Sequence, residues 1–592
     1  MHSEPMPLHR AFRDELSHLR IQGKKFALEN PQLARFLGER ASDPDVERLL
    51  EGFSFLTAKL RMKIEDDFEE LTHGLLQLLW PNYLRPIPSM TILKFEPSDR
   101  AIADSQTVPK GAMVGSVEVD GIACRFRTCS DVRIHPLEIE RVHEAHSMES
   151  SMVAMELRTL SDLDLRSVDC DELELHFSGD DRAAQTLYLW LARYLEEIRI
   201  VMGDSVSTLP TGSIQFPGFE ADAALLPYPR NVFDGYRVLQ EFFVFPRRFY
   251  FARIKSLARA WPAQGLSARI ELHFNRPMPL GVHIRNGDIS LHCVPAVNLF
   301  AHDAEPIRVD GRVTEYAINP AGSQAHGYEV FSVDGVSGVW ASSRERAKEV
   351  RRIYHDFYSF QHEIDRTSNG PAPYYRSRLH VDQSVGGTRQ RIAFIRSDES
   401  LHPDASETVS VQLTCTNRDL PSVLAVGDVC HPLDDVPAFV NVANAIRPTP
   451  SYRPVLDGSL HWNLISNLSL NFLSLLGTEP MKAVIRAYDF AALHDVQAKR
   501  VSQMRLNGIV AATTVPSTAF VMGLPVRGLK TVLELDPSMF LCEGEMYLFG
   551  SVLSHFFSLY ASINAFHVLE VKNTENKETY QWPIRHGSQP II

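Results

Sequence analysis

The first part of the chain carries apolar residues at the spacing of an α-helix. Phe12, Leu16, Leu19 and Phe26 recur at near-helical intervals, and basic and acidic side chains stand between them. Such a pattern predicts an amphipathic helix with one apolar stripe. A stripe of this kind must be covered by another surface, so these four residues are the candidates for binding a partner.

A second and longer helical pattern follows. It opens at Ser42-Asp43-Pro44, where an N-cap residue precedes a proline that fits the first helical turn, and it stops at Trp80-Pro81. Its apolar face consists of Val46, Leu49, Phe53, Leu56, Leu60, Ile64 and Phe68. Residues 1–85 are therefore predicted to form a helical N-terminal region.

From residue 86 onward the spacing changes to short alternating runs separated by turn signals, which is typical of β-strands. The predicted strands include Thr91–Phe95, Val117–Val119, Ala123–Phe126, Glu172–Phe177, Ala268–Phe274, Gly281–Ile284, Glu329–Val333, Arg391–Ile395 and Val409–Thr416. No repeat of fixed period is present in the sequence, which disfavours a propeller or solenoid and leaves sandwiches or irregular barrels open. We predict a multi-domain α+β protein, with β-rich domains over 86–375 and a C-terminal α+β domain over 376–592.

Helices are expected to interrupt these strands at Gln185–Glu197, Trp462–Leu476 and Tyr547–Phe566. The last segment is the most apolar and has the length of a membrane span. Its polar and small residues are too frequent for hydrocarbon, and no basic flank orients it, so a buried helix is the favoured interpretation.

Composition limits the classes of function. The chain has 592 residues, a net charge of -13, 44% hydrophobic and 22% charged residues, which is typical of a large globular protein and argues against a general nucleic-acid coat. Seven cysteines do not suggest a disulfide framework, and the close pair Cys124 and Cys129 lacks a second pair for structural zinc. With no signal peptide at the N-terminus, the cytoplasm is the expected compartment.

Motifs that carry catalysis or cofactor binding are missing from the sequence. It contains no phosphate-binding P-loop, no dinucleotide fingerprint and no nucleophile elbow. His143 and His146 are spaced for metal binding on a helix, but a third ligand is lacking, so a charged turn is the favoured interpretation. Glu543 and Glu545 open a predicted buried helix, where capping explains them better than acid–base catalysis.

The densest basic cluster, Arg344, Arg346, Lys348, Arg351 and Arg352, is interspersed with glutamates, which disfavours nucleic-acid binding. We therefore expect no catalytic residue, no cofactor, no metal and no nucleic-acid partner. Large apolar faces without catalytic motifs favour a structural role.

Recognisable blocks of sequence occur in order along nearly the whole chain. The clearest block runs from Lys63–Thr72 through Leu78–Leu84 to Arg85–Met90. Further blocks are Leu225–Pro229, Gly235–Phe243, Phe245-Pro246, Cys293–Phe300, Tyr328–Asp334, Leu413–Pro421, Leu464–Asn471, Tyr547–Leu553, Tyr560–Phe566 and Trp582-Pro583. Together these blocks resemble the baseplate subunit TssF family of type VI secretion systems. A weaker likeness to phage baseplate wedge proteins includes the stretch from Cys124 to Ile134.

The resemblance implies a non-enzymatic scaffold. TssF-like subunits assemble with TssG, TssK and TssE, and with further copies of themselves, around the VgrG spike, and the platform primes sheath and tube assembly. It also implies a cytoplasmic baseplate docked at the inner-membrane complex, without insertion into the membrane. Two alternatives stay open: a β-rich carbohydrate- or peptidoglycan-active protein using Glu543 and Glu545, and peripheral membrane attachment through Tyr547–Phe566.

Overall fold

The structure is a computed structural model that describes residues 7–29, 44–97, 104–160, 163–228, 234–310, 313–341, 349–358, 373–382, 387–396, 407–437, 439–456, 465, 477–521, 524–561 and 564–587. The chain divides into two compact units. Unit 1 comprises residues 1–78 and 456–465, and unit 2 comprises residues 79–455 and 466–592. Each unit is described by itself.

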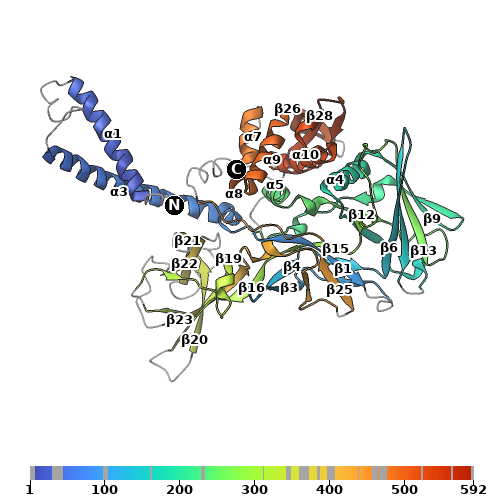
Figure 1. Ribbon diagram of the computed structural model, residues 1–592, viewed down its shortest axis with the longest axis horizontal. Coiled ribbons are helices and arrows are strands. Elements are labelled where there is room, and N and C mark those ends of the chain that lie inside the picture. The colour runs from blue at the N-terminus through green and yellow to red at the C-terminus, as the bar shows by residue number, and fades with distance from the viewer. Residues whose placement is uncertain are drawn as a thin grey trace. The chain divides into compact units, whose positions relative to one another are not determined.

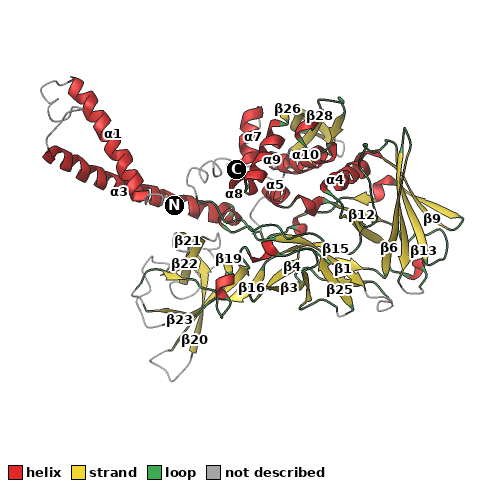
Figure 2. Cartoon of the chain, in the orientation of Figure 1, coloured by secondary structure: helices red, strands yellow, loops and turns green. Residues whose placement is uncertain are grey.

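Unit 1 is built from two long helices, α1 (Pro7–Glu29) and α3 (Pro44–Leu79), whose last residue already belongs to unit 2. Proline 44 stands at the first position of α3, where its missing N–H leaves no intrahelical hydrogen bond unmade. Helix α3 ends before Pro81, which opens a short 3-10 turn. Both stretches with a helical pattern in the sequence are helices in the structure (Figure 2).

Unit 2 contains several antiparallel sheets. The β1 sheet has the order β24 (Val429–Pro432), β3 (Met113–Val119), β4 (Ile122–Thr128), β15 (Cys293–Val297), β1 (Met90–Pro97), β25 (Val440–Asn444). The β7 sheet has the order β10 (Ser205–Leu209), β9 (Leu195–Met202), β13 (Ser267–Phe274), β7 (Ser151–Thr159), β6 (Leu137–His146). The β8 sheet has the order β11 (Ile214–Gln215), β12 (Phe251–Lys255), β8 (Glu172–Phe177), β14 (Ile289–Ser290), and β2 (Gln106–Val108) pairs with β5 (Val132–Ile134).

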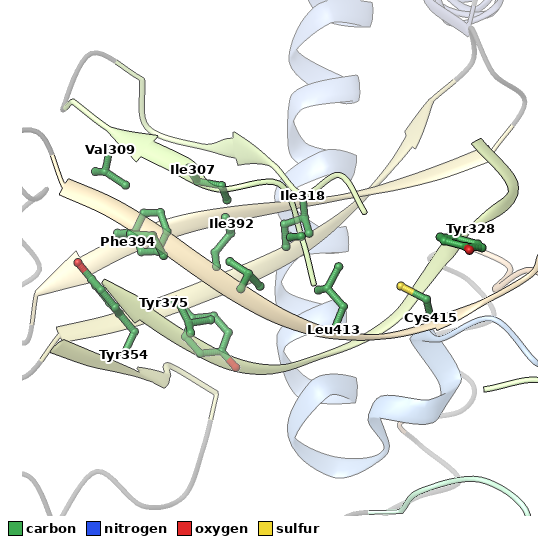
Figure 3. Packing of buried hydrophobic residues seen from close by; sticks show 14 of the residues in the cluster. Ile307, Val309, Ile318, Tyr328, Tyr354, Tyr375, Ile392, Phe394, Leu413 and Cys415 are labelled. Carbon is green, nitrogen blue, oxygen red and sulfur yellow. The ribbon is translucent and has the colours of Figure 1, made fainter. Parts of the chain in front are cut away.

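A further sheet, the β23 sheet, surrounds a core of its own. Its order is β16 (Phe300–Asp303), β23 (Glu407–Thr416), β19 (Glu329–Ala341), β20 (Glu349–Asp356), β21 (Pro373–Asp382), β22 (Gly387–Arg396), β18 (Tyr316–Ala317), and β17 (Ile307–Val309) pairs with β23. Strand β23 alternates buried and exposed positions, as one covered face requires. Figure 3 shows Leu413 and Cys415 of β23 on the same side as Ile392 and Phe394 of β22.

The C-terminal part combines helices with the β28 sheet (Figure 1). Strands β26 (Ile509–Val521) and β27 (Leu524–Leu535) form a hairpin, and β27 lies parallel to β28 (Phe566–Asn573), with α10 (Glu543–Phe557) as the crossover. The sheet is completed by β29 (Thr579–Gln581) and β30 (Arg585–His586). The other helices of unit 2 are α4 (Asp181–Leu189), α5 (Asp234–Val244), α7 (Thr478–Arg486), α8 (Ala491–His494) and α9 (Val496–Asn507).

Three predicted elements need correction or comment. Gly281–Ile284 is a turn and loop and not a strand. The predicted helix Gln185–Glu197 ends early, because α4 passes into a π-helical turn at Trp190–Tyr194 and Leu195 already pairs in β9 with β13. Apart from Ile465, which is helical, the predicted helix Trp462–Leu476 lies outside the described residues.

The α+β fold with mainly β domains and inserted core helices is confirmed. Position 376 lies within β21, and β23 and β25 pair with strands from before that position, so hydrogen bonds join the second and third predicted segments. The division into 1–85, 86–375 and 376–592 itself stays a prediction.

Candidate interaction surfaces

The predicted stripe on α1 is partly covered by the chain itself. Phe12 meets Phe55 of α3 edge-on, with ring centroids 6.5 Å apart. Phe12, Leu16 and Leu19 are all half-buried, so each retains accessible surface. The side chain of Phe26 lies outside the described part of the chain.

A more exposed apolar surface lies on α3. Leu49, Phe53 and Leu56 are 73%, 59% and 60% exposed, and we call these three residues the α3 stripe. Their spacing of four and three positions puts them on one side of the helix. In the same part of the helix Ser54 and Ala58 are fully buried and lie on the other side at 3.6 residues per turn, and further along α3 Thr72 and Leu76 are fully buried too. Between Leu49 and Ala58 the helix therefore turns two small residues inward and leaves the α3 stripe exposed.

This arrangement inverts the usual rule that the largest apolar side chains are buried. The sequence pattern identified the face that contains the α3 stripe, and it could not tell that Leu49, Phe53 and Leu56 stay exposed. Contiguous exposed apolar residues mark interaction surfaces in soluble proteins. The α3 stripe is therefore the stronger candidate for partner binding. The predicted residues on α1, which we call the α1 stripe, contact α3 through the pair Phe12 and Phe55.

The block Leu78–Leu84 supplies an anchor inside unit 2. Trp80 is fully buried, and its ring centroid lies 5.4 Å from that of Tyr488 and 5.8 Å from those of Tyr83 and Tyr236. Tyr83 in turn packs edge-on against Phe490 at 4.9 Å. Aromatic side chains from three distant stretches of sequence thus enclose one tryptophan, which gives this block a packing role.

A buried charge network joins two of the blocks that carry the resemblance, Leu225–Pro229 and Gly235–Phe243. Glu241 of α5 bonds to Arg237, at 3.2 Å, and to Arg248, and all three side chains are at most 2% exposed. Its other oxygen accepts the backbone N–H of Leu225 at 3.0 Å. Burial and the neighbouring Arg237 charge lower the pKa of Arg248 to about 9.

The two guanidinium groups also hold the loop before α5. Arg237 donates to the carbonyl oxygens of Phe219 and Glu220, and Arg248 donates to that of Ala223. The carbonyl oxygen of Glu220 also accepts the backbone N–H of Ala223, and the arginines add hydrogen bonds to carbonyl groups of this loop. The resemblance in this region therefore reflects a folding constraint.

A pair of buried asparagines joins two other blocks, Cys293–Phe300 and Leu413–Pro421. Asn298 donates to the carbonyl oxygen of Arg125 and to the side-chain oxygen of Asn417, both at 2.8 Å. The N–H of Asn417 donates back to Asn298 at 2.7 Å. These bonds join β4 to the loops that follow β15 and β23, and they satisfy polar groups that would be costly to bury alone.

The carboxylate pair considered for hydrolysis is engaged in structural contacts. Glu543 accepts hydrogen bonds from Asn573, Asn576 and Tyr580, at 3.1, 2.8 and 2.6 Å. Glu545 accepts from Arg505 at 2.8 Å and from the backbone N–H of Leu541 at 2.6 Å. Both acids stand in the first turn of α10, where they favour the positive end of the helix dipole. The arrangement secures the start of α10.

The histidine pair was predicted in a turn, and this prediction is wrong. His143 and His146 lie in strand β6, so their odd spacing points the two side chains to opposite faces. His143 pairs with Glu156 at 3.2 Å and His146 with Glu144 at 3.3 Å. Within the described residues no cluster of three or more metal-binding side chains occurs.

Hollows in unit 2 offer little chemistry. One, of about 280 Å³, is lined by residues that include Cys129, Glu174, Arg248 and Arg253. Arg253 already pairs with Glu174 at 2.7 Å, and burial raises the pKa of the Cys129 thiol to about 11, which keeps it protonated at neutral pH.

Of the predicted basic cluster, Arg344, Arg346 and Lys348 lie outside the described residues.

The described helices include none long and apolar enough to cross a membrane. Helix α10, which covers most of the predicted apolar segment, buries nearly all of its residues within unit 2.

Comparisons with known proteins agree along the whole chain. The family model described as Type VI secretion system, TssF matches residues 6–589. Type VI secretion system component TssF1 of Pseudomonas aeruginosa PAO1 is 28% identical over 631 residues, covering 98% of this chain and 99% of the relative.

Two solved structures are similar. A chain of the TssK-TssF-TssG baseplate subcomplex determined by cryo-electron microscopy matches with a TM-score of 0.75 and 28% identity, covering 92% of this chain and 99% of that one. A chain of the baseplate complex from the type VI secretion system matches with a TM-score of 0.62 and 24% identity, covering 99% and 100%, which supports the fold alone.

Proposed function

Because the chain belongs to the TssF family of type VI secretion systems, we propose that it is a structural, non-catalytic wedge subunit of the baseplate. It assembles with TssG-like and TssK-like subunits, the proteins named with TssF in the similar subcomplex. The engagement of Glu543 and Glu545 in structural contacts supports a scaffold over a hydrolase.

The observation that carries this proposal is the α3 stripe. Leu49, Phe53 and Leu56 keep more than half of their surface exposed, although water contact with such side chains is unfavourable. Covering the three on assembly would contribute roughly 3–6 kcal/mol, given about 1.5–3 kcal/mol for a fully buried large apolar side chain. Exposure of this extent is costly for a solitary protein and useful for an obligate subunit.

The α1 stripe is the second part of the proposed contact. Phe12, Leu16 and Leu19 are half-buried in the same helical unit and have area left for a partner, and Phe26 is included from the sequence pattern alone. We expect a joint interface of the obligate class, above about 2,000 Å² in total.

Contacts with a TssE-like subunit, with the VgrG-like spike and with further copies of this chain belong to the same proposal. In this role the protein acts in the cytoplasm, within a baseplate that docks at the inner-membrane complex and primes sheath and tube assembly. These steps need rigid geometry and no reaction at a pocket.

The proposal is tested by co-expressing the chain with its TssG-like and TssK-like subunits. A complex stable through gel filtration is expected. Phe53→Asp should abolish or strongly reduce co-elution with only a small effect on the melting temperature of the free chain, because 59% of the Phe53 surface is already exposed to water. Leu280→Asp, at a 97% exposed turn residue of unit 2, is the matched control.

Leu16→Asp examines the α1 stripe in the same assay. Since Leu16 is half-buried, this variant should lower both the melting temperature and the yield of complex. Recovery of only free chain for the unmodified protein, or full assembly of Phe53→Asp, would contradict the proposed function.

A further inference from the structure

Helix α9 presents an apolar stripe to solvent in the C-terminal part of unit 2, far along the sequence from α1 and α3. Val496 and Met504 are 66% and 49% exposed, and Val501 beside them is 42% exposed. Val496, Arg500 and Met504 are four positions apart and lie along one line of the helix. Leu493 of α8, just before α9, is a further 43% exposed. We call Val496, Arg500, Val501 and Met504 the α9 face.

Helix α9 is anchored to the rest of unit 2 through its buried side. Ser502 and Leu506 are buried on its inner side, and Arg505 donates to Glu545 of α10 at 2.8 Å. The Asp495 side chain caps its first turn by accepting the N–H of Gln497 at 2.8 Å. The α9 face is therefore preorganised, which lowers the entropy lost when a partner binds.

Charge is a second feature of this face. Helix α9 contains no acidic residue, and the described part of the chain offers no ion pair to Lys499 or Arg500, both exposed. Residues 477–535 carry seven basic and four acidic residues, a net of +3, in a chain whose total is -13. Arg505, the third basic residue of the helix, is by contrast paired with Glu545.

We propose that the α9 face docks an acidic amphipathic helix of a partner protein. The apolar side of that helix would cover Val496 and Met504, and its carboxylates would meet Arg500, which lies between them, and Lys499, which stands one turn after Val496 at the edge of the face. The 12-residue α9 is about 18 Å long and offers three to four turns for such pairing. Opposite charges set the choice and orientation of the partner, while the apolar contacts supply most of the affinity.

An anionic membrane is the competing occupant, because basic amphipathic helices also bind lipid surfaces. Membrane attachment of this kind relies on clusters of 4–8 basic residues and large apolar side chains. The α9 face has short side chains, Val496 and Val501, and two basic residues outside the ion pair with Glu545. These features favour a protein helix.

The test uses the full-length chain and two synthetic probes. One is a fluorescent 18-residue helical peptide with leucines along one face and glutamates beside them, and the other has lysine at every glutamate position. Fluorescence anisotropy should show binding of the acidic peptide, weakened by salt, and about tenfold weaker or absent binding of the basic peptide.

Variants assign the binding to the α9 face. Arg500→Glu and Met504→Asp should each weaken the acidic peptide about tenfold, whereas Arg259→Glu and Leu280→Asp, exposed positions elsewhere, should not. The double variant Lys499→Glu/Arg500→Glu should now bind the basic peptide, a rescue that misfolding cannot produce.

Several results would overturn the proposal: no binding of the acidic peptide, equal binding of both peptides, or binding that the α9 variants leave unchanged. Co-sedimentation with vesicles of phosphatidylcholine and phosphatidylserine tests whether the α9 face binds an anionic membrane instead. Co-sedimentation that Arg500→Glu abolishes, without peptide binding, would assign the face to lipid. None of these measurements depends on assembly with baseplate subunits, so failure here leaves the proposed function standing.

Discussion

Replacing Glu241 by glutamine tests the buried charge network of α5. The carboxylate lies between Arg237 and Arg248, and the three side chains are 1%, 0% and 2% exposed. Glutamine keeps the size of the side chain and can still accept the N–H of Leu225, so the substitution removes charge with little change in packing.

The expected cost follows from the burial of both arginines. Without the carboxylate, two guanidinium charges remain inside unit 2 and lack the ion-pair partner that they shared, and breaking a buried pair in this way costs about 3–5 kcal/mol. The pKa of Arg248 is already lowered to about 9 by burial and by Arg237, which indicates that its charge is poorly solvated. Salt should not change the effect, because the pair is shielded from solvent.

Hydrogen–deuterium exchange of peptides that cover residues 219–250, together with urea unfolding, measures this cost. The matched control is Glu138→Gln, whose ion pair with Arg158 is exposed, with side chains 38% and 52% accessible. The control should shift stability by less than about 1 kcal/mol. Adding Arg248→Met to Glu241→Gln should recover part of the loss by removing one buried charge. Equal costs for Glu241→Gln and Glu138→Gln would refute the reasoning.

Two further predictions concern unit 2. Gly544→Ala should destabilise the packing of α10 on α4 by about 1–3 kcal/mol, because the added Cβ would lie 2.1 Å from the carbonyl oxygen of Gln185, whereas Gly212→Ala, with nothing within 4 Å, should be near neutral in thermal melting. The free energy of unfolding should also fall as the pH drops from about 6.5 to 4. In this range the histidines of the unfolded chain bind protons, whereas the buried histidines of the folded chain stay neutral, so each histidine lowers the free energy of unfolding by up to about 1.4 kcal/mol per pH unit. Urea titrations at several pH values measure this slope, and a slope that His292→Gln leaves unchanged would count against it. Burial lowers the pKa to about 3 in His176 and His292 and to about 4 in His135 and His567.

Local patterns predicted much of the secondary structure because they depend on neighbours in sequence. The 3.6-residue spacing and the Pro44 start signal predicted α3, and the alternation over Glu172–Phe177 predicted β8 with its observed bounds. The helix expected over Gln185–Glu197 failed for a non-local reason. Its last residues, Leu195–Glu197, form the start of β9 and pair with β13, a strand that lies about 70 residues later in the sequence.

The roles of the charged candidates could not be read from the sequence. Glu543 and Glu545 acquire their partners from Tyr580 and Arg505, which lie 37 and 40 positions away. No spacing rule connects such residues, because a crossover from β27 to β28 and the packing of α9 on α10 bring them together.

The sequence by itself determined which residues share a face, which motifs of catalysis are missing and which family the chain resembles. Only the tertiary structure decided which faces are covered. Periodicity shows that Leu49, Phe53 and Leu56 lie together, as do Val496 and Met504, but burial depends on what packs against them. In this part of α3 the inward positions are taken by Ser54 and Ala58, and Leu49, Phe53 and Leu56 are left facing solvent.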